Sequence, residues 1–264
     1  MGRLDTSVAI VTGAGSGNGL AIATALAGEG CAVVIGEYSD ERGAAAAEGI
    51  TRAGGRARFV RTDVSRWADI DRLVGFTLRE FGALHILVNN AGVLDGYATC
   101  LDTSDELFDR VIAINLKGVF FGCRRVLPEM VRARYGKIIN IASVAGLQAK
   151  AGGTAYTAAK HGVVGLTRQL ACEYGPSGIR ANALCPGPVS TQLRKTSVEV
   201  LGEIAPSMTG GLGTASEEYI RELIPLGFRG SSDDVARATV FLASRDSDYM
   251  NGHALVLDGG LTAK

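Results

Sequence analysis

Residues 8–19 read Val8-Ala-Ile-Val-Thr-Gly-Ala-Gly-Ser-Gly-Asn-Gly19, an apolar run typical of a buried strand followed directly by a glycine-rich loop. A helical pattern of apolar residues comes next, at positions 20, 22, 23 and 26. Such a loop lets backbone N–H groups and the positive end of a helix approach a pyrophosphate without interference from Cβ atoms. The spacing is not G-x-G-x-x-G, because Asn18 stands at the last position counted from Gly13. It is instead T-G-x-x-x-G-x-G.

Apolar runs of strand type recur along the chain, with helical stretches between them. They lie at residues 8–11, 32–35, 57–60, 85–88, 137–141, 179–184 and 254–257. This alternation predicts a parallel α/β sheet, and the continuous apolar character of the runs predicts burial on both faces. We therefore expect a doubly wound sheet of about seven strands with helices on both faces. No linker or internal repeat divides the chain, so a single domain over residues 1–264 is expected.

Charge and cysteine usage disfavour several classes of partner. Lys plus Arg equals Asp plus Glu at 27 each, and no basic tract is present, so no nucleic-acid partner is expected. No apolar stretch approaches the ~20 residues needed to span a bilayer, and no signal peptide is evident. The five cysteines are scattered and never spaced as C-x-x-C, which favours reduced thiols in the cytoplasm. Neither these nor the three histidines form a metal-ligand pattern, so no metal is expected.

Tyr156 and Lys160 stand in the sequence Tyr-Thr-Ala-Ala-Lys, a spacing that places both side chains on one face of a helix. A phenol beside an ammonium group can transfer protons. The pKa of free tyrosine is about 10, and burial opposes the field of the lysine, so a second cation is needed for activity near neutral pH. An oxidised nicotinamide ring would provide that cation.

Several further motifs follow one another along the chain. They are Asp63-Val64, Asn89-Asn-Ala-Gly92, Asn115 in Ile-Asn-Leu-Lys, Ser143 in Ile-Ala-Ser-Val, Pro186-Gly187 and Asp258-Gly-Gly260. With the glycine loop and the Tyr156/Lys160 pair, they make the chain resemble the short-chain dehydrogenase/reductase family over nearly its whole length. The resemblance implies a Rossmann fold and a catalytic tetrad of Asn115, Ser143, Tyr156 and Lys160.

The resemblance also implies a role for each of these residues. Tyr156 would exchange the hydroxyl proton of the substrate, while Ser143 hydrogen-bonds the same oxygen. Lys160 would lower the tyrosine pKa and bind the nicotinamide ribose, and Asn115 would hold a water that connects Lys160 to solvent. The residues expected to bind the cofactor are Gly13, Ser16, Gly17, Asn18, Gly19, Glu37, Asp63, Val64, Asn90, Ala91, Gly92, Tyr156, Lys160, Pro186, Gly187, Val189 and Thr191.

The cofactor is predicted to be NAD because Glu37 ends the second apolar run. A carboxylate there can accept hydrogen bonds from both adenosine ribose hydroxyls. Each charge of a 2′-phosphate would cost about 4 kcal/mol at about 4 Å and an effective dielectric near 20. Arg42 is the one nearby cation in the sequence, and Asp40 and Glu41 adjoin it.

Asn18 departs from the family pattern, in which a branched apolar residue is usual at this position. Asparagine is a good N-cap and tolerates unusual backbone angles. We expect Asn18 to cap the first helix and to alter the hydrogen bonds at the pyrophosphate without abolishing cofactor binding.

The resemblance places the substrate pocket beside the tetrad and under a segment over about residues 189–226, inserted before the last helix and strand. Within it, residues 207–214 are expected to form a lid over the bound cofactor. A secondary alcohol or ketone would suit the small and apolar residues, while cyclic and aromatic ketones, hydroxysteroids and sugar alcohols stay open. The expected pocket residues are Leu94, Asp95, Val144, Gln148, Ala149, Thr154 and Leu193.

A narrower resemblance is to the 2-hydroxypropyl-coenzyme M dehydrogenases, through residues 16–23 and 251–258. Such enzymes hold a sulfonate, for which guanidinium groups are suited. Gly153 stands where one arginine would be expected, which leaves Arg194 and Lys195 as candidates.

Other functions stay open as alternatives. A 3-ketoacyl-carrier-protein reductase would share the tetrad and use a basic docking patch, with arginines at 124, 125, 132 and 134 as candidates, although Glu37 argues against it. A non-catalytic NAD-sensing protein would not need the whole tetrad. An enoyl reductase is disfavoured, because such enzymes space tyrosine and lysine further apart.

Assembly is suggested by the apolar residues of the helix that follows Tyr156, at 163, 164, 166 and 170. A homotetramer, or a homodimer, would bury them, and simple core packing is the alternative.

Overall fold

The computed structural model describes residues 2–263, whose centre is one sheet of seven parallel strands in the order β3-β2-β1-β4-β5-β6-β7. The strands are β1 (Val8–Thr12), β2 (Ala32–Glu37), β3 (Arg56–Arg61), β4 (Ile86–Asn89), β5 (Gly136–Ile141), β6 (Ile179–Pro186) and β7 (Ala254–Leu257). Each run predicted from the sequence corresponds to one strand. The prediction of a doubly wound parallel sheet is therefore confirmed, and the strand order is that of a Rossmann fold.

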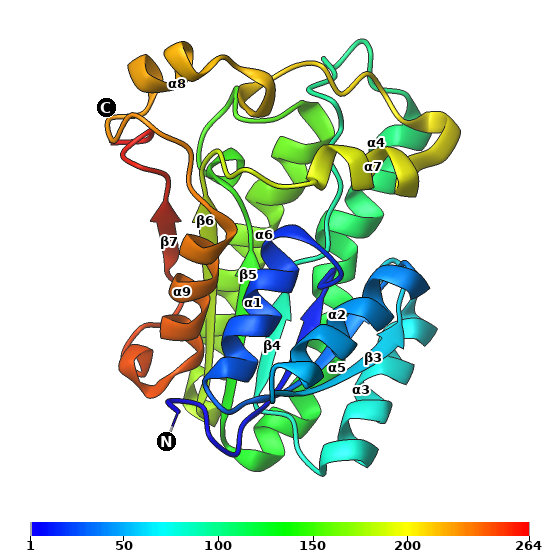
Figure 1. Ribbon diagram of the computed structural model, residues 1–264, viewed down its shortest axis with the longest axis vertical. Coiled ribbons are helices and arrows are strands. Elements are labelled where there is room, and N and C mark those ends of the chain that lie inside the picture. The colour runs from blue at the N-terminus through cyan, green and yellow to red at the C-terminus, as the bar shows by residue number, and fades with distance from the viewer. Residues whose placement is uncertain (1, 264) are drawn as a thin grey trace.

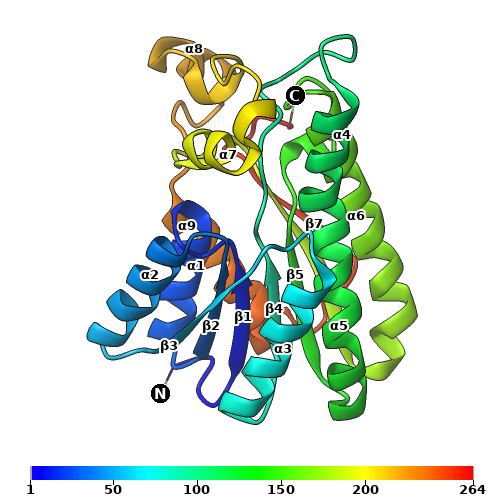
Figure 2. The same ribbon diagram turned by 90° about the vertical axis from the view of Figure 1, so that its right-hand side faces the viewer.

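Helices cover both faces of the sheet, as Figures 1 and 2 show. α1 (Gly17–Gly28), α2 (Asp40–Arg52) and α9 (Ser232–Ala243) lie on one face. α3 (Trp67–Phe81), α5 (Gly118–Ala133) and α6 (Thr154–Tyr174) lie on the other. Three further helices lie toward the carboxyl ends of the strands: α4 (Asp105–Ile112), α7 (Leu193–Leu201) and α8 (Glu217–Leu223).

The inner strands β1, β2, β4 and β5 are buried on both sides because their successive side chains enter two different cores, whereas the edge strands β3 and β7 are partly exposed. Val11 packs with the residues of α1 and α9, whereas its neighbour Ile10 packs with those of α3 and α5. Both side chains are fully buried. This explains why the strands read as continuously apolar rather than alternating.

The helix α6 contributes its apolar residues to the chain's own core. Val163, Val164 and Leu170 are buried beneath the sheet, and Leu166 packs against the same cluster. The assembly argument built on these residues is therefore wrong, since core packing already accounts for them.

The order of the strands reverses between β1 and β4, which are hydrogen-bonded neighbours. In such sheets ligands bind in the crevice outside the carboxyl ends of the strands at this switch point. The glycine loop follows β1 at this switch point, and the turn that begins at Asn90 follows β4. Residues 189–226, which include α7 and α8, lie above the same edge (Figure 2). Within residues 2–263, no helix is both long and apolar enough to cross a membrane.

Candidate active site

The glycine loop forms a cradle that side chains would fill. Gly13 and Gly17 have φ values of 64° and 52°, in the left-handed region that favours glycine. A Cβ on Gly19 would lie 2.1 Å from the Gly13 carbonyl oxygen, so this position also requires glycine. Ser16 is the N-cap of α1, and its side chain makes no capping hydrogen bond. These features fit a pyrophosphate at the N-terminus of α1.

Asn18 does not cap α1, which corrects the expectation from the sequence. The helix begins at Gly17, so Asn18 already lies within its first turn. Its Oδ1 accepts a hydrogen bond of 2.9 Å from the Ser232 hydroxyl, at the start of α9. Asn18 also lines the cofactor cavity, and the bond to Ser232 ties the loop to α9.

Glu37 is fixed at the end of β2 by two backbone N–H groups. One carboxylate oxygen accepts from the Gly15 amide at 2.9 Å, and the other accepts from the Ser39 amide at 3.1 Å. The residue is 7% exposed and lines the cavity. Arg42 lies with its Nη2 3.7 Å from Glu37 and forms a second ion pair with Glu199 of α7. Its partners are thus Glu37 and Glu199, rather than the adjoining Asp40 and Glu41.

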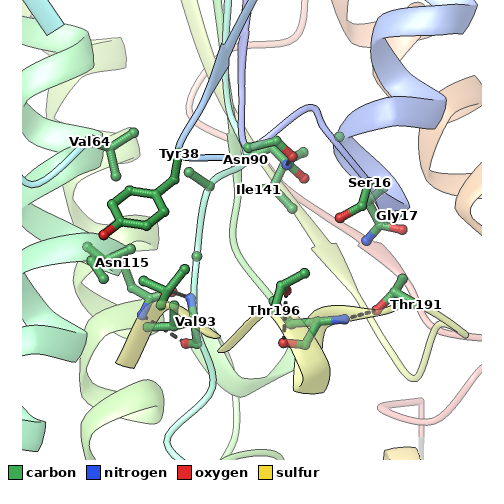
Figure 3. Close-up of a pocket in the computed structure, with 18 of the residues that line it drawn as sticks. Ser16, Gly17, Tyr38, Val64, Asn90, Val93, Asn115, Ile141, Thr191 and Thr196 are labelled. Carbon is green, nitrogen blue, oxygen red and sulfur yellow. Dashed lines mark hydrogen bonds between the residues drawn. The ribbon is translucent and has the colours of Figure 1, made fainter. Parts of the chain in front are cut away.

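The turn after β4 is held by its own Asn90 side chain and by the Asn115 side chain from another segment. The Asn90 amide group donates to the Thr12 and Gly13 carbonyls, at 2.9 and 3.1 Å. Asn115 lies in a π-helical turn, Ala113–Lys117, between α4 and α5. Its amide donates to the Val93 carbonyl, and its oxygen accepts from the Val93 amide (Figure 3). The same amide also donates to the Val111 carbonyl. Both Nδ2 hydrogens are therefore used by the backbone, and the side chain has no donor left for the expected water.

Tyr156 and Lys160 lie on the first two turns of α6, and both are buried. Burial raises the pKa of the Tyr156 phenol well above 10, and the Ser143 hydroxyl partly offsets this increase. Burial lowers the pKa of Lys160 to about 8. The Lys160 ammonium donates to the Ile141 carbonyl at 2.8 Å and lies 5.5 Å from the centre of the Tyr156 ring. Without a further cation, the phenol therefore stays protonated near neutral pH.

Two cavities meet at Ser143 and Tyr156, which line both of them. The first has a volume of about 200 Å³ and runs along the glycine loop, where Figure 3 shows Ser16 and Gly17 across from Val64 and Asn115. Every residue expected to bind the cofactor lines it, as do all four tetrad residues. Lining residues that the sequence did not indicate include Tyr38, Thr62 and Val93, which belong to no motif. Ile114, Ile141 and Ala142 also line the cavity as motif neighbours of Asn115 and Ser143, and Thr196 and Val200 lie in the 189–226 segment.

The second cavity, of about 450 Å³, lies between the Tyr156 phenol and residues 187–229. Of the expected pocket residues, Leu94, Val144 and Leu193 line it, whereas Asp95, Gln148, Ala149 and Thr154 line neither cavity. The Thr154 amide instead donates to the Ala98 carbonyl at the start of α6. The sequence did not indicate Tyr97, Ala151, Pro188 and Arg229 as lining residues. Tyr97, Ala151 and Pro188 lie close to motifs in the sequence, whereas Arg229 lies close to none.

The two candidate anion-binding residues differ in position. Arg194 lines the second cavity. Its guanidinium donates a hydrogen bond of 2.6 Å to the Met208 carbonyl and lies 5.9 Å from the centre of the Tyr97 ring. Both of these partners are uncharged, so no counter-ion neutralises Arg194 in the part of the chain that the structure describes. Lys195 is exposed and lines neither cavity.

The arginines considered as a docking patch are already engaged within the chain. Arg125 pairs with Asp71 and Glu129, and Arg132 pairs with Glu129. The Arg124 guanidinium lies 5.0 Å from the centre of the Trp67 ring. Arg134 donates to the Pro176 carbonyl. Carboxylates therefore balance Arg125 and Arg132, whereas Arg124 and Arg134 have uncharged partners and keep their positive charge.

Known proteins share both the sequence and the fold. The family model described as short chain dehydrogenase matches residues 7–201. The 2-(R)-hydroxypropyl-CoM dehydrogenase of Xanthobacter autotrophicus is 41% identical over 259 residues, covering 97% of this chain and 98% of that protein. The cyclohexanol dehydrogenase of an Acinetobacter strain is 34% identical over 262 residues, covering 99% and 97%. The crystal structure of levodione reductase has a TM-score of 0.88 at 34% sequence identity, with 99% of each chain covered.

Proposed function

Because the chain belongs to the short-chain dehydrogenase family, we propose that it is an NAD-dependent oxidoreductase that interconverts a secondary alcohol and its ketone by hydride transfer. The observation that carries the proposal is the position of Ser143 and Tyr156, which line both the cavity of the glycine loop and the second cavity. A carbonyl or hydroxyl oxygen at this junction would reach both hydroxyl groups while its carbon faces the cofactor site.

The chain's own residues would transfer the hydroxyl proton of the substrate and hold its oxygen. Bound NAD would supply the hydride acceptor or donor. In the oxidising direction Tyr156 takes the hydroxyl proton of the alcohol, and the Ser143 hydroxyl holds the same oxygen. Lys160, which lines the first cavity, would bind the nicotinamide ribose and stabilise the phenolate by its charge. Asn115 supports the site indirectly, because its side chain fixes the backbone at Val93.

The preference for NAD follows from the fixed carboxylate of Glu37. Its two oxygens are held in place by the Gly15 and Ser39 amides, so the negative charge cannot move away from a 2′-phosphate. Arg42 could attract such a phosphate, but Glu37 and Glu199 already neutralise it. This balance of charge supports NAD over NADP.

The second cavity supports a substrate of modest size, and its lining combines apolar and polar residues. Its volume of about 450 Å³ falls within the range of small-molecule sites. Apolar lining residues are Leu94, Val144, Ala151, Pro188, Val189, Leu193, Leu212 and Ala215. Cyclic secondary alcohols and ketones, such as those in the names of the cyclohexanol and levodione enzymes, are the substrates we favour.

A second candidate substrate is an anionic secondary alcohol of the 2-hydroxypropyl thioether sulfonate type. It is favoured by Arg194, whose charge faces the second cavity without a neutralising partner among residues 2–263. An arginine at 153 would have to displace the Asp95 carboxylate, because its Cβ would lie 2.5 Å from an Asp95 oxygen. Recognition of a sulfonate would therefore depend on Arg194.

The test is a panel of secondary alcohols, including cyclohexanol and a 2-hydroxypropyl sulfonate thioether, assayed with NAD and with NADP by the absorbance of the reduced cofactor. We expect turnover with NAD, and a loss of at least about 1000-fold in kcat for Tyr156→Phe with little change in the Kd for NAD. Binding of NAD without turnover across a broad panel would favour an NAD-sensing protein. A Tyr156→Phe variant as active as the wild type would refute the proposed chemistry.

A cytoplasmic location and a homotetramer, or a homodimer, complete the proposal. The five cysteines are all unpaired, which suits a reducing compartment.

Exposed aromatic side chains on neighbouring helices, Trp67 on α3 and Phe120 on α5, support an assembly surface. Light scattering coupled to size-exclusion chromatography measures the oligomeric state directly.

A further inference from the structure

Asp95 is a fully buried carboxylate in the segment after β4. One of its oxygens accepts hydrogen bonds from the amides of Tyr97 and Gly153, at 3.2 and 3.1 Å. The other accepts from the amide of Tyr156 at 2.8 Å. A buried carboxylate is tolerated only where such donors compensate for the lost water. All three donors here are backbone N–H groups, and one belongs to the residue that carries the phenol.

Two of these bonds cap the helix α6 from a distant part of the chain. The first N–H groups of a helix have no partner within it. The residue at the N-cap is Gly153, which has no side chain to supply one. Asp95 supplies the acceptors instead, and its negative charge also suits the positive end of the helix dipole.

Gly153 and Asp95 depend on each other sterically. A Cβ built on Gly153 would lie 2.5 and 2.6 Å from the two carboxylate oxygens. Any larger residue at 153 must therefore displace the carboxylate. The absence of a side chain at 153 thus accounts for the close approach of Asp95 to the Tyr156 amide.

The residues next to Asp95 hold the same stretch of chain. The Tyr97 hydroxyl donates to the Ala151 carbonyl at 3.1 Å, and the Thr154 amide donates to the Ala98 carbonyl at 3.1 Å. Tyr97 has a φ of 64°, an unfavourable conformation for a non-glycine residue that the surrounding contacts maintain. Hydrogen bonds from residues 95–98 therefore fix the position of residues 151–156.

We infer that Asp95 is a positioning residue for Tyr156, which fixes the first turn of α6 so that the phenol meets Ser143 at the junction of the two cavities. Its charge also acts on the phenol: after burial, the fields of Tyr97 and Asp95 contribute to the raised pKa of Tyr156. The inference rests on the proposed role of Tyr156 as the proton-transfer group.

Asp95→Asn tests the inference, because it keeps the shape of the side chain while removing its charge and one acceptor. We expect kcat to fall by about tenfold or more, since the amide would face the Tyr156 N–H with a donor. Loss of the Asp95 negative charge would also make the Tyr156 phenolate easier to form, which lowers the pKa of Tyr156. The acid limb of kcat/KM for alcohol oxidation, where Tyr156 loses its proton, should therefore move to lower pH by about one pH unit.

Gly153→Ala is the second variant, and it displaces the carboxylate without removing its charge. We expect a fall in kcat of about tenfold and a smaller movement of the acid limb in the same direction. The matched control is Asp102→Asn, an exposed carboxylate on the same connection, which should leave both quantities unchanged. Circular dichroism and the Kd for NAD show whether each variant is folded.

The outcomes separate this inference from the proposed function. Turnover by the wild type, lost in Tyr156→Phe, establishes the proposed function whatever the Asp95 variants do. A folded Asp95→Asn with wild-type kcat overturns the inference. So does a loss of kcat that is uniform with pH and leaves the acid limb in place, because that assigns Asp95 to folding alone. If Asp95→Asn does not fold, a Gly153→Ala variant with wild-type kcat and pH profile overturns it equally.

Discussion

The Lys160 ammonium lies 5.5 Å from the centre of the Tyr156 ring, yet its hydrogen bond goes to the Ile141 carbonyl. The lysine therefore makes no hydrogen bond to the phenol in this structure, and its charge lies beside the aromatic ring. Burial opposes the charged form of both groups, so the pKa of Lys160 falls to about 8 and that of Tyr156 rises. A third charge at the site would change the protonation of both groups.

We predict that binding of oxidised NAD releases protons near pH 8. Lys160 is about half protonated at that pH, because burial lowers its pKa to about 8. A positive nicotinamide ring beside it disfavours the protonated form, which lowers this pKa further and expels up to about half a proton from the lysine. Calorimetric titration at pH 8 in two buffers with different ionisation enthalpies measures the number released.

Reduced NAD, whose ring is uncharged, should release fewer protons. Lys160→Met should remove the lysine contribution while leaving the fold intact. Equal heats of binding in the two buffers for the wild type would contradict the prediction.

We predict that Glu37→Gln shifts the cofactor preference toward NADP. The amide removes the charge that repels a 2′-phosphate and frees Arg42 from one of its two carboxylates. The ratio of kcat/KM for NADP to that for NAD should rise by about 100-fold, which corresponds to about 2.7 kcal/mol.

Glu199→Gln is the matched variant, because it frees Arg42 on the α7 side and leaves Glu37 in place. We expect it to have a smaller effect alone and to add to Glu37→Gln in the double variant. An unchanged ratio in the double variant would mean that Arg42 and Glu37 do not determine the choice of cofactor.

The strands and the cofactor loop could be predicted because their signals are local. The continuous apolar run at Val8–Thr12 and the glycines that follow it specify strand, turn and helix within about twenty residues. Glycine is needed at 13 and 19 because backbone atoms of nearby segments approach closely. The spacing of the glycines in the sequence therefore indicates where these approaches occur.

The relations that could not be predicted join residues far apart in the chain. Asn18 was expected to act locally as a cap, but its oxygen is bound by Ser232, which is 214 residues away. Asp95 was expected to line the pocket, but its carboxylate is turned to the backbone at 153 and 156. Neither relation has a periodicity or a motif, because each depends on how loops from different strands meet.

We predict that Asn115→Leu destabilises the protein independently of any substrate. The change leaves the Val93 amide and the carbonyls of Val93 and Val111 without their present partner in a fully buried position. The free energy of unfolding should fall by about 3 kcal/mol. Urea unfolding measures this change, with Gln169→Leu on the exposed surface of α6 as a control expected to stay within about 0.5 kcal/mol. A decrease below about 1 kcal/mol would show that water replaces the amide adequately.

We predict that Arg194→Met separates the two candidate substrate classes. If the substrate is an anionic alcohol, loss of the guanidinium should raise its KM by about 100-fold, because a charge-assisted hydrogen bond of roughly 2.7 kcal/mol disappears. The KM for a neutral cyclic alcohol, which has no charge for the guanidinium to bind, should change by less than about threefold. Steady-state kinetics with both alcohols gives the two KM values.

Lys195→Met is the control, since this residue is adjacent in sequence but exposed and outside both cavities. It removes the same charge from the same helix, so any long-range effect of net charge appears in it as well. An equal rise in KM for the anionic alcohol in both variants would assign the effect to general electrostatic attraction. A rise confined to Arg194→Met would place the anion against the Tyr97 side of the second cavity, where the guanidinium lies.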